Sequence, residues 1–556
     1  MSIAHRQEAS AELEKRSRML PTEHASSGDT PVISAAFASK ACDDLGIDRM
    51  LEELNKLMKT SYTLEKKGVM HQLQICLDAR EDFGSAYGRL RPYWNTPSLF
   101  PKLDLLLSTY ETEDNQMREM ALDHETNRVI QPQTPPRRLW DLYSDRVLPW
   151  WVVQPKKEDV WVVSHSWRER EYLRNETTPI NGRKWPVPIP RDTTLEHVRQ
   201  ELLSYGAEYA WLDVLCLRQK GVPELEDVRR EEWKLDVPTI GYIYKEQKNI
   251  MTYFCGLGLP FHTGDLDNKR HWLNRAWTFQ EINANPFIGG LMKPEDSESA
   301  HKLEGVKQAH DGGGSHAFFD TLAEAIHFVS TEFDIFSVLK RMRPRHAESE
   351  MDKIAGLAYM LKSPHLPAYI CDQDLEEAWI GLVNNMNAPY RAELFLLFSD
   401  RGAKRYAWLP CWEQIKTATK LPRPGQQGVS RKDGEYVSYR DGSYQFTGLR
   451  IKGCRIEGLG EKDPKGDCRQ GSMLVRDGEG VEQRISVMAH HQTKIRDTHH
   501  HDYVLLGTND CHYWVVGKEV EPGKFDKISV LRVESQDDQA RIKKRSLVRR
   551  RVMNLI

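Results

Sequence analysis

A carboxylate and an indole recur at helical spacing in the stretch 272–282. Asn274, Trp277 and Glu281 are separated by three and four residues, so in a helix they would line one face. Phe279 would lie on the opposite, apolar face. The stretch therefore predicts a helix that presents Trp277 and Glu281 together.

Glu281 is the candidate catalytic residue of this stretch. A carboxylate can stabilise the oxocarbenium-like state that forms when the bond between nicotinamide and ribose breaks, as carboxylates do in glycoside hydrolysis, and no metal is needed. Alternatively, Glu281 could pair with Arg275 and only fix the helix. The sequence alone favours this structural interpretation and leaves the catalytic one open.

Polar side chains also follow two apolar runs, 159–164 and 209–213, which are typical of strands buried on both faces. Ser164 and Ser166 follow the first run, and Asp213 ends the second. Ligands bind at the carboxyl ends of strands in open parallel sheets, so the serines could bind a phosphate or ribose and Asp213 a ribose hydroxyl. The serines could equally cap a turn, whereas for Asp213 a cap on the loop after its strand is favoured. His165 is favoured as a structural, hydrogen-bonded histidine.

The elements around these residues alternate between strand and helix. Thr193 and Glu196 form a capping box that predicts the start of a helix, and Gly206 is expected to end it. Further strands are predicted at 249–254 and 286–289. This alternation predicts an α/β fold with a parallel sheet and flanking helices.

The rest of the chain divides by composition and pattern. Helical spacing dominates before a proline-containing linker at 131–136, and short strands between Gly and Asp turns dominate after residue 434. The predicted parts are a disordered N-terminus (1–35), a helical N-terminal region (36–130), the α/β domain (136–290), an exposed insertion (291–316), a helical extension (317–415), a β-rich C-terminal domain (430–535) and a basic tail (536–556). The tail could be a nuclear-import or anionic-surface patch, but an exposed terminal helix is favoured.

Composition excludes several classes of function. Charges nearly cancel, with 78 basic and 81 acidic residues, so no general field would draw the chain onto nucleic acid. Nine cysteines occur singly, without a Cys-x-x-Cys pair, which favours free thiols in a reducing compartment. No apolar run is long enough to span a membrane, and the N-terminus lacks a signal sequence. A cytoplasmic protein is expected.

No metal site is predicted. The histidine groups 490–491 and 499–501 lie in a polar stretch without the cysteine or acidic spacing of a zinc site, so a solvated loop is favoured. Cys216 is expected to be a buried thiol, because no cationic partner is evident beside it.

Four ordered motifs resemble the fungal heterokaryon incompatibility (HET) domain family over about residues 136–415. The motifs are Val160–Arg168, Tyr209–Gln219, Tyr242–Phe254 and Asn274–Ile282. Two loops depart from the family pattern. The family often has Tyr-x-Trp-Gly after the first strand, where this chain has His-Ser-Trp-Arg at 165–168. Leu217 and Arg218 stand in place of the Ile-Asn in its Cys-Ile-Asn-Gln.

HET domains are similar to Toll/interleukin-receptor (TIR) domains, and this likeness implies a flavodoxin-like sheet. The spacing of Trp277 and Glu281 resembles that in the TIR helix whose glutamate serves the NAD-hydrolysing members. Ser164 and Trp167 in the loop after the first strand, and Asp213 after the second, lie where TIR domains place theirs. The resemblance implies a binding site of Ser164, Ser166, Trp167, Asp213 and Trp277, with NAD as a candidate substrate and no required cofactor.

The resemblance also implies a role in fungal non-self recognition and programmed cell death, with protein partners and self-association through the α/β domain. Whether the protein is an enzyme stays open. It could cleave NAD with Glu281, or it could act as a non-catalytic adaptor. No specific nucleic-acid partner and no membrane span are expected.

Overall fold

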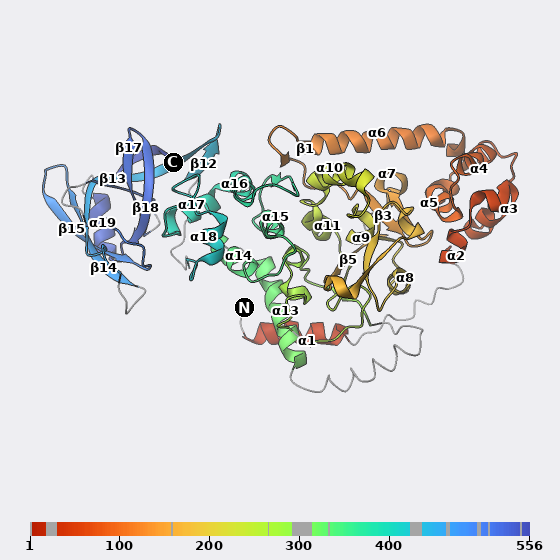
Figure 1. The fold of residues 1–556 in the computed structure, drawn as a ribbon, viewed down its shortest axis with the longest axis horizontal. Helices are drawn as coiled ribbons and strands as arrows, with labels where there is room; N and C mark the ends of the chain where they lie inside the picture. The colour runs from red at the N-terminus through yellow and green to blue at the C-terminus, as the bar shows by residue number, and fades with distance from the viewer. Residues whose placement is uncertain are drawn as a thin grey trace. The chain divides into compact units, whose positions relative to one another are not determined.

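The computed structural model describes residues 3–17, 31–156, 159–264, 266–291, 314–331, 334–422, 436–462, 468–497, 502–509, 512–544 and 547–556 (Figure 1). The chain forms two compact units. Unit 1 comprises Met1–Thr331, Arg345–Tyr359 and His365–Asp372, and unit 2 comprises Glu332–Pro344, Met360–Pro364 and Gln373–Ile556. No helix in the described ranges is long and apolar enough to cross a membrane.

Unit 1 is built on a mixed sheet with the order β10-β9-β5-β8-β3-β4. Its strands are β3 (Arg138–Asp141), β4 (Arg146–Pro149), β5 (Val160–His165), β8 (Tyr209–Leu212), β9 (Ile250–Tyr253) and β10 (Phe287–Ile288). β5 pairs in parallel with β8 and β9, and β9 with β10. All residues of β5, β8 and β9 are buried, as their continuous apolar sequences predict. The predicted α/β fold is confirmed.

The parallel strands have a flavodoxin-like arrangement. When β5, β8, β9 and β10 are numbered 1 to 4 along the chain, their order across the sheet is 2-1-3-4. The connections therefore lead from β5 toward opposite edges of the sheet. This reversal is a topological switch point, and in such folds ligands bind beside it at the carboxyl ends of the strands. The hairpin β3–β4 extends the sheet antiparallel to β8, which the sequence did not predict.

Helices connect the strands of this sheet. They are α8 (Leu195–Ser204), α9 (Asp213–Cys216), α10 (Glu226–Asp236) and α11 (Ile240–Glu246). The small hairpin of β6 (Leu173–Glu176) and β7 (Val187–Pro190) lies between β5 and α8 in the chain. The N-cap of α8 is Thr194 rather than the predicted Thr193, because the Thr193 hydroxyl donates to the Gly258 carbonyl instead.

The predicted helical N-terminal region is confirmed, and it packs around its own apolar core. It contains α2 (Ala35–Ala38), α3 (Cys42–Met58), α4 (Val69–Asp78), α5 (Phe83–Trp94) and α6 (Leu103–Ala121). The Arg91 guanidinium on α5 donates to Asp141 (2.9 Å) and to the Tyr209 hydroxyl (2.7 Å). A buried charge-assisted contact therefore joins these helices to the sheet.

The segment that was predicted to be disordered, 1–35, contains a helix, α1 (Ile3–Ser17), while residues 18–30 lie outside the described ranges. Leu13 on α1 packs with Phe254, Trp272 and Phe318 in one apolar cluster. Phe318 belongs to α13 (Gly314–Ser330). Tertiary burial of an apolar side chain explains why this polar stretch is ordered as a helix.

Unit 2 contains α14 (Ile335–Met342), α16 (Leu375–Asn385), α17 (Ala388–Leu397), α18 (Trp412–Thr417) and an antiparallel-rich sheet. The strands are β12 (Val437–Arg440), β13 (Ser443–Glu457), β14 (Arg469–Arg476), β15 (Glu482–Ala489), β16 (Tyr503–Gly507), β17 (Tyr513–Glu521), β18 (Lys524–Arg532) and β19 (Arg549–Leu555). Pairing of β13 with β16 closes the order β13-β14-β15-β18-β17-β16 on itself. The β-rich C-terminal part is confirmed.

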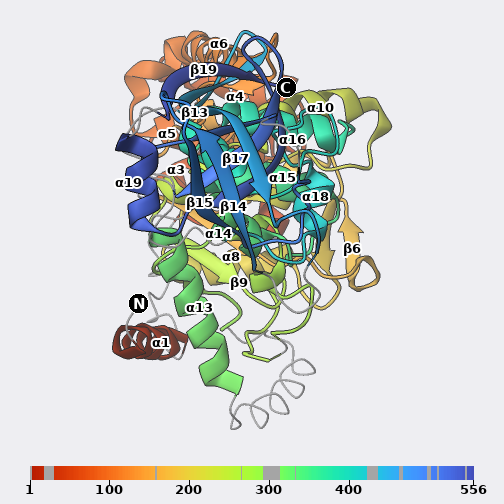
Figure 2. The ribbon, with the colours of Figure 1, turned by 90° about the vertical axis from the view of Figure 1, so that its left-hand side faces the viewer.

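The basic tail is only partly the exposed helix that was favoured. Residues Gln536–Lys544 form α19 (Figure 2). Asp538 on this helix accepts a hydrogen bond from the backbone N–H of Ser486 on β15. Residues Arg549–Leu555 form β19, which pairs with β13 and β18. Part of the basic run is therefore a strand of the sheet.

Candidate functional site

The stretch 272–282 is not the predicted helix. It forms two short 3₁₀ turns, Trp272–Asn274 and Trp277–Gln280, with Arg275 extended between them (φ −89°, ψ 145°). The backbone of this joint pairs with His346: Ala276 N–H donates to the His346 carbonyl (2.9 Å), and His346 N–H donates to the Asn274 carbonyl (2.6 Å). The prediction of a continuous helix is therefore wrong.

Side chains also donate hydrogen bonds to backbone carbonyls that would accept from N–H groups in a helix. The Arg345 guanidinium donates to the Arg275 carbonyl (2.7 Å) and lies over the Phe279 ring (4.5 Å). The Thr278 hydroxyl lies within hydrogen-bond distance of the carbonyls of Trp272 (2.5 Å) and Arg275 (3.0 Å). These tertiary contacts override the local helical pattern. Arg345 lies 70 residues after Arg275, so the spacing within the stretch cannot reveal this partner.

The consequence is that Trp277 and Glu281 have different partners. Trp277 is partly exposed, packs near the Tyr369 ring (6.2 Å) and hydrogen-bonds Asp352. Tyr369 donates to the same carboxylate (2.9 Å). The structure does not bring Trp277 into the cluster around Glu281.

Glu281 lies in a buried cluster at the carboxyl end of β5. Its side chain accepts a hydrogen bond from the Ser164 hydroxyl, and the residue is 8% exposed. The Ser164 oxygen accepts in turn from the Trp272 indole N–H (2.7 Å). The Tyr244 hydroxyl lies between Glu281 and the Val163 carbonyl, to which it donates (3.0 Å). The predicted alternative, a pair with Arg275, is not formed, since Arg275 pairs with Glu348.

Burial raises the pKa of Glu281 to about 7, with a further increase from the Asp213 charge that the Ser164 hydrogen bond and His165 oppose. The carboxyl group is thus poised between its two forms at neutral pH. The Tyr244 hydrogen bond also opposes the increase in the Glu281 pKa. A pKa near the working pH is the property that proton transfer requires.

His165 and Asp213 form a second pair beside this cluster, with Nε2 and Oδ1 separated by 2.8 Å. Burial disfavours the imidazolium, but the Asp213 carboxylate outweighs it and raises the pKa of His165. Asp213 also accepts from the Val214 N–H (2.7 Å), so the predicted cap exists together with the pair. His165 is the hydrogen-bonded, buried histidine that was favoured.

The loop after β5 carries the remaining candidates. Ser166 is buried, and its backbone N–H donates to the Tyr253 carbonyl (3.2 Å) across the switch point between β5 and β9. The partly exposed Trp167 ring lies 5.7 Å from the His165 ring. The sequence thus located Ser164, Ser166, Trp167 and Asp213 at one edge of the sheet.

Two members of the cluster were not among the predicted site residues. Tyr244 lies on α11 inside the third motif, and Trp272 begins the stretch that carries Glu281. The presence of Tyr244 in a motif is a usable signal, whereas Trp272 precedes the fourth motif by two residues, and the partners of both are set only by the fold. Among the described residues, no group of three or more His, Cys, Asp or Glu side chains could hold a metal ion.

The structure also describes the cysteine and histidine side chains for which no site was predicted. Cys216 is buried, and burial raises the pKa of its thiol to about 12. His491, for which a solvated loop was favoured, is instead partly buried and lies within hydrogen-bond distance of the Val530 carbonyl (2.7 Å), and residues 499–501 lie outside the described ranges. The eight cysteines in the described part of the chain are free thiols.

Comparisons of this chain with protein-family models, with curated proteins and with solved structures found no match. The resemblance to HET domains therefore rests on the four motifs alone.

Proposed function

We propose that this chain is a HET-type protein that acts in fungal non-self recognition and programmed cell death signalling. The α/β part of unit 1 would be the effector. In this proposal the protein acts in the cytoplasm, binds protein partners of non-self recognition and self-associates through the α/β domain.

The observation that supports the proposal is that each of the four motifs supplies a side chain to one polar cluster. The first motif supplies Ser164 and His165, the second Asp213, the third Tyr244 and the fourth Glu281. Motifs that only maintained a fold would be expected to contribute apolar core residues. Here they converge at the carboxyl edge, beside the switch point where α/β folds bind ligands.

A second candidate function is cleavage of NAD, with Glu281 stabilising the oxocarbenium-like state. It is favoured by the Glu281 pKa of about 7, which leaves a substantial ionised fraction at neutral pH. Against it stands the burial of the carboxyl group, which would have to exchange its bond to Ser164 for the substrate. The adaptor alternative requires no such exchange.

Expression of the full chain in fungal cells tests the proposal and separates its versions. Wild type, Glu281→Gln and the matched control Glu65→Gln, which alters an exposed glutamate of the N-terminal region, are compared at equal protein levels. Cell death and cellular NAD are measured in parallel. We expect wild type and control to kill. Absence of death at every expression level, alone and with partner strains, would refute the signalling role.

The two versions give opposite results for Glu281→Gln. If Glu281 cleaves NAD, the variant loses both toxicity and NAD depletion. If the domain is an adaptor, toxicity stays while NAD is unchanged in wild type and variant. Turnover of NAD by the purified full chain, with and without the substitution, confirms the assignment directly.

A further inference from the structure

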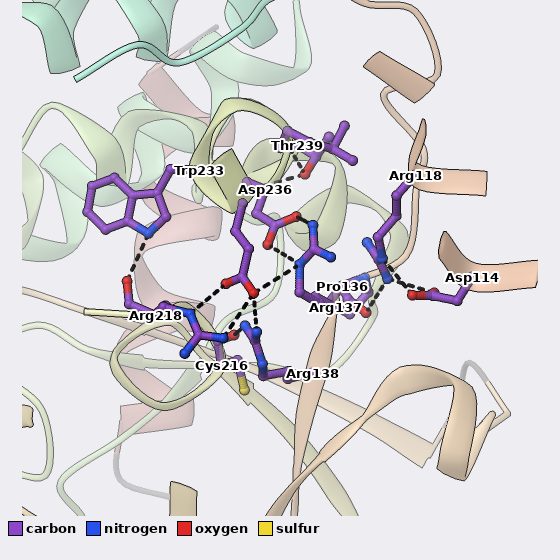
Figure 3. A network of polar contacts seen from close by, with 12 residues as sticks. Asp114, Arg118, Pro136, Arg137, Arg138, Cys216, Arg218, Trp233, Asp236 and Thr239 are labelled. Carbon is purple, nitrogen blue, oxygen red and sulfur yellow. Dashed lines mark hydrogen bonds and ion pairs between the residues drawn. The ribbon is translucent and has the colours of Figure 1, made fainter. Parts of the chain in front are cut away.

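A second polar network lies at the edge of the same sheet and is rich in arginine (Figure 3). Arg138 begins β3, and Arg218 follows α9. Both guanidinium groups contact the same oxygen, Oε1 of Glu232 on α10, and Arg218 does so at 3.2 Å. The neighbouring Arg137 pairs with Asp236 (2.9 Å). Two guanidinium groups therefore share mainly one carboxylate.

Lys184 adds a third positive charge to this group. Lys184 directly precedes Trp185 in the chain, and its pKa is lowered by partial burial and then by the charges of Arg138 and Arg218. Within the described ranges, the Lys184 ammonium has no ion-pair or hydrogen-bond partner, while the Lys184 backbone N–H donates to the Asn181 carbonyl (3.4 Å). Arg137 Nε also lies 3.9 Å from the same Glu232 oxygen, so four cations face the two carboxylates of Glu232 and Asp236 and leave a surplus of two positive charges. Such a surplus is costly in a protein unless an anion compensates it.

The cations are held in place by buried contacts. The Trp185 ring is 1% exposed and has the Arg138 and Arg218 guanidinium carbons 5.3 and 5.2 Å from its centroid. Its indole N–H donates to the Val214 carbonyl (3.2 Å). Arg138 also donates to the Cys216 carbonyl (3.3 Å), and the Trp233 indole donates to the Arg218 carbonyl (2.9 Å; Figure 3). These contacts fix the positions of both guanidinium groups.

The group lies where a ligand could reach it. β3 runs antiparallel to β8, so Arg138 at the start of β3 and Arg218 beyond β8 occupy the carboxyl edge of the sheet. The Lys184 residue is exposed, while the side chains of Arg138 and Arg218 are 14% and 11% exposed. Arg218 is also one of the two positions at which the second motif, Tyr209–Gln219, departs from the HET family pattern.

We propose that Lys184, Arg138 and Arg218 form a binding site for the phosphate group of a small molecule. Guanidinium groups bind phosphate through parallel N–H donors, and lysine adds a point charge. A phosphate dianion matches the surplus of two charges, whereas a carboxylate would neutralise only one. The proposal goes beyond the proposed function, because it does not involve Glu281.

Calorimetric titration of the full chain tests this site, with inorganic pyrophosphate and AMP as probes at constant ionic strength. Wild type is compared with Lys184→Gln and Arg218→Lys, and with Lys67→Gln as a control. Lys67 is an exposed lysine of the N-terminal helical region, so the control makes the same charge change elsewhere. We expect Lys184→Gln to weaken binding about tenfold, Arg218→Lys to weaken it as well, and the control to bind as wild type.

Binding of both probes would show that a phosphate group is sufficient for recognition. Binding of AMP alone would show that the ligand is a nucleotide. Either result supports the site if it depends on Lys184. No binding of either probe, or equal affinity in Lys184→Gln and wild type, overturns it. Glu281→Gln is expected to keep phosphate binding, so failure of the cell-death experiment would leave this test intact.

Discussion

Glu281 is a carboxyl group whose surroundings raise its pKa to the pH of a cell, so that both of its forms are populated there. Its pKa is raised from 4.5 to about 7, chiefly by burial. The raised pKa therefore stabilises the folded state fully below about pH 4.5, and this contribution is lost as the pH rises through 7. Above pH 7 the folded protein must hold a buried charge.

Glu281→Gln removes this dependence, because glutamine is neutral at every pH. We expect the variant to gain stability over wild type as the pH rises from 5 to 8, by up to about 1.4 kcal/mol per pH unit. Urea unfolding of both proteins at pH 5, 6, 7 and 8 measures the difference. A constant difference across this range would contradict the assigned pKa, and Glu65→Gln serves as the exposed control.

Asp213→Asn is expected to lower the pKa of His165. Asp213 is the group that raises this pKa against the effect of burial, and asparagine keeps the size but not the charge. Titration of carbon-13-labelled histidine in the full chain, followed by NMR, gives the value. An unchanged His165 titration in the variant would show that the pair does not set its protonation.

At the scale of single residues, the sequence could predict which strand ends carry polar groups, because buried strands are continuous apolar runs with abrupt ends. It placed Ser164, Asp213 and Glu281 among the candidates. It could not supply Tyr244 and Trp272 as their partners, since those contacts join residues 80 to 110 positions apart.

At the scale of elements, the joint between the two 3₁₀ turns depends on Arg345. We expect Arg345→Ala to destabilise the fold by about 2 kcal/mol, because the Arg275 carbonyl loses its charged donor and Phe279 loses its cationic neighbour. Arg345→Lys should recover part of this loss. Calorimetric unfolding compares the three proteins, and equal midpoints would show that the joint forms without Arg345.

The segment after β10 depends on a glycine and on a buried carboxylate. Glu201 accepts from the Tyr253 hydroxyl (2.7 Å) and from the N–H groups of Gly290 (2.9 Å) and Leu291 (3.1 Å). Gly290 has φ +82°, and a Cβ there would lie 2.1 Å from the Leu259 carbonyl oxygen. Backbone rather than a movable side chain blocks any larger residue.

We therefore expect Gly290→Ala to cost at least about 3 kcal/mol. Gly206→Ala is the matched control, because Gly206 has φ +80° with nothing within 4 Å of a Cβ, so only the conformational cost of about 1 kcal/mol remains. Urea midpoints of the two variants separate steric overlap from backbone strain. Equal losses would show that the segment moves aside.

Element prediction was most accurate where one residue pattern dominated. The apolar strands β5, β8 and β9 and the helical N-terminal region follow from their sequences. The stretch 272–282 was assigned wrongly because hydrogen bonds from His346 and Arg345 outweigh its helical spacing. The hairpin β3–β4 was missed because its short strands mix charged and apolar residues.

At the scale of the whole molecule, neither unit is a continuous piece of chain. The α/β sheet needs Arg91 from α5, and α17 of unit 2 is held by Lys527 on β18, which donates to the Phe395 carbonyl (2.9 Å). A fragment of residues 130–420 would lack one partner of each contact. We expect it to be degraded by trypsin at concentrations that leave the full chain intact. Equal resistance would show that these contacts are dispensable.

The discontinuity of the units bears on how the protein is made. Unit 1 includes His365–Asp372, so the ribosome must release residues up to 372 before that unit can close. By then Glu332–Pro344 and Met360–Pro364, which belong to unit 2, have already emerged without the strands they accompany. During translation there is therefore a long interval in which neither unit is complete. A truncated transcript that ends before the codon for residue 372 yields neither complete unit.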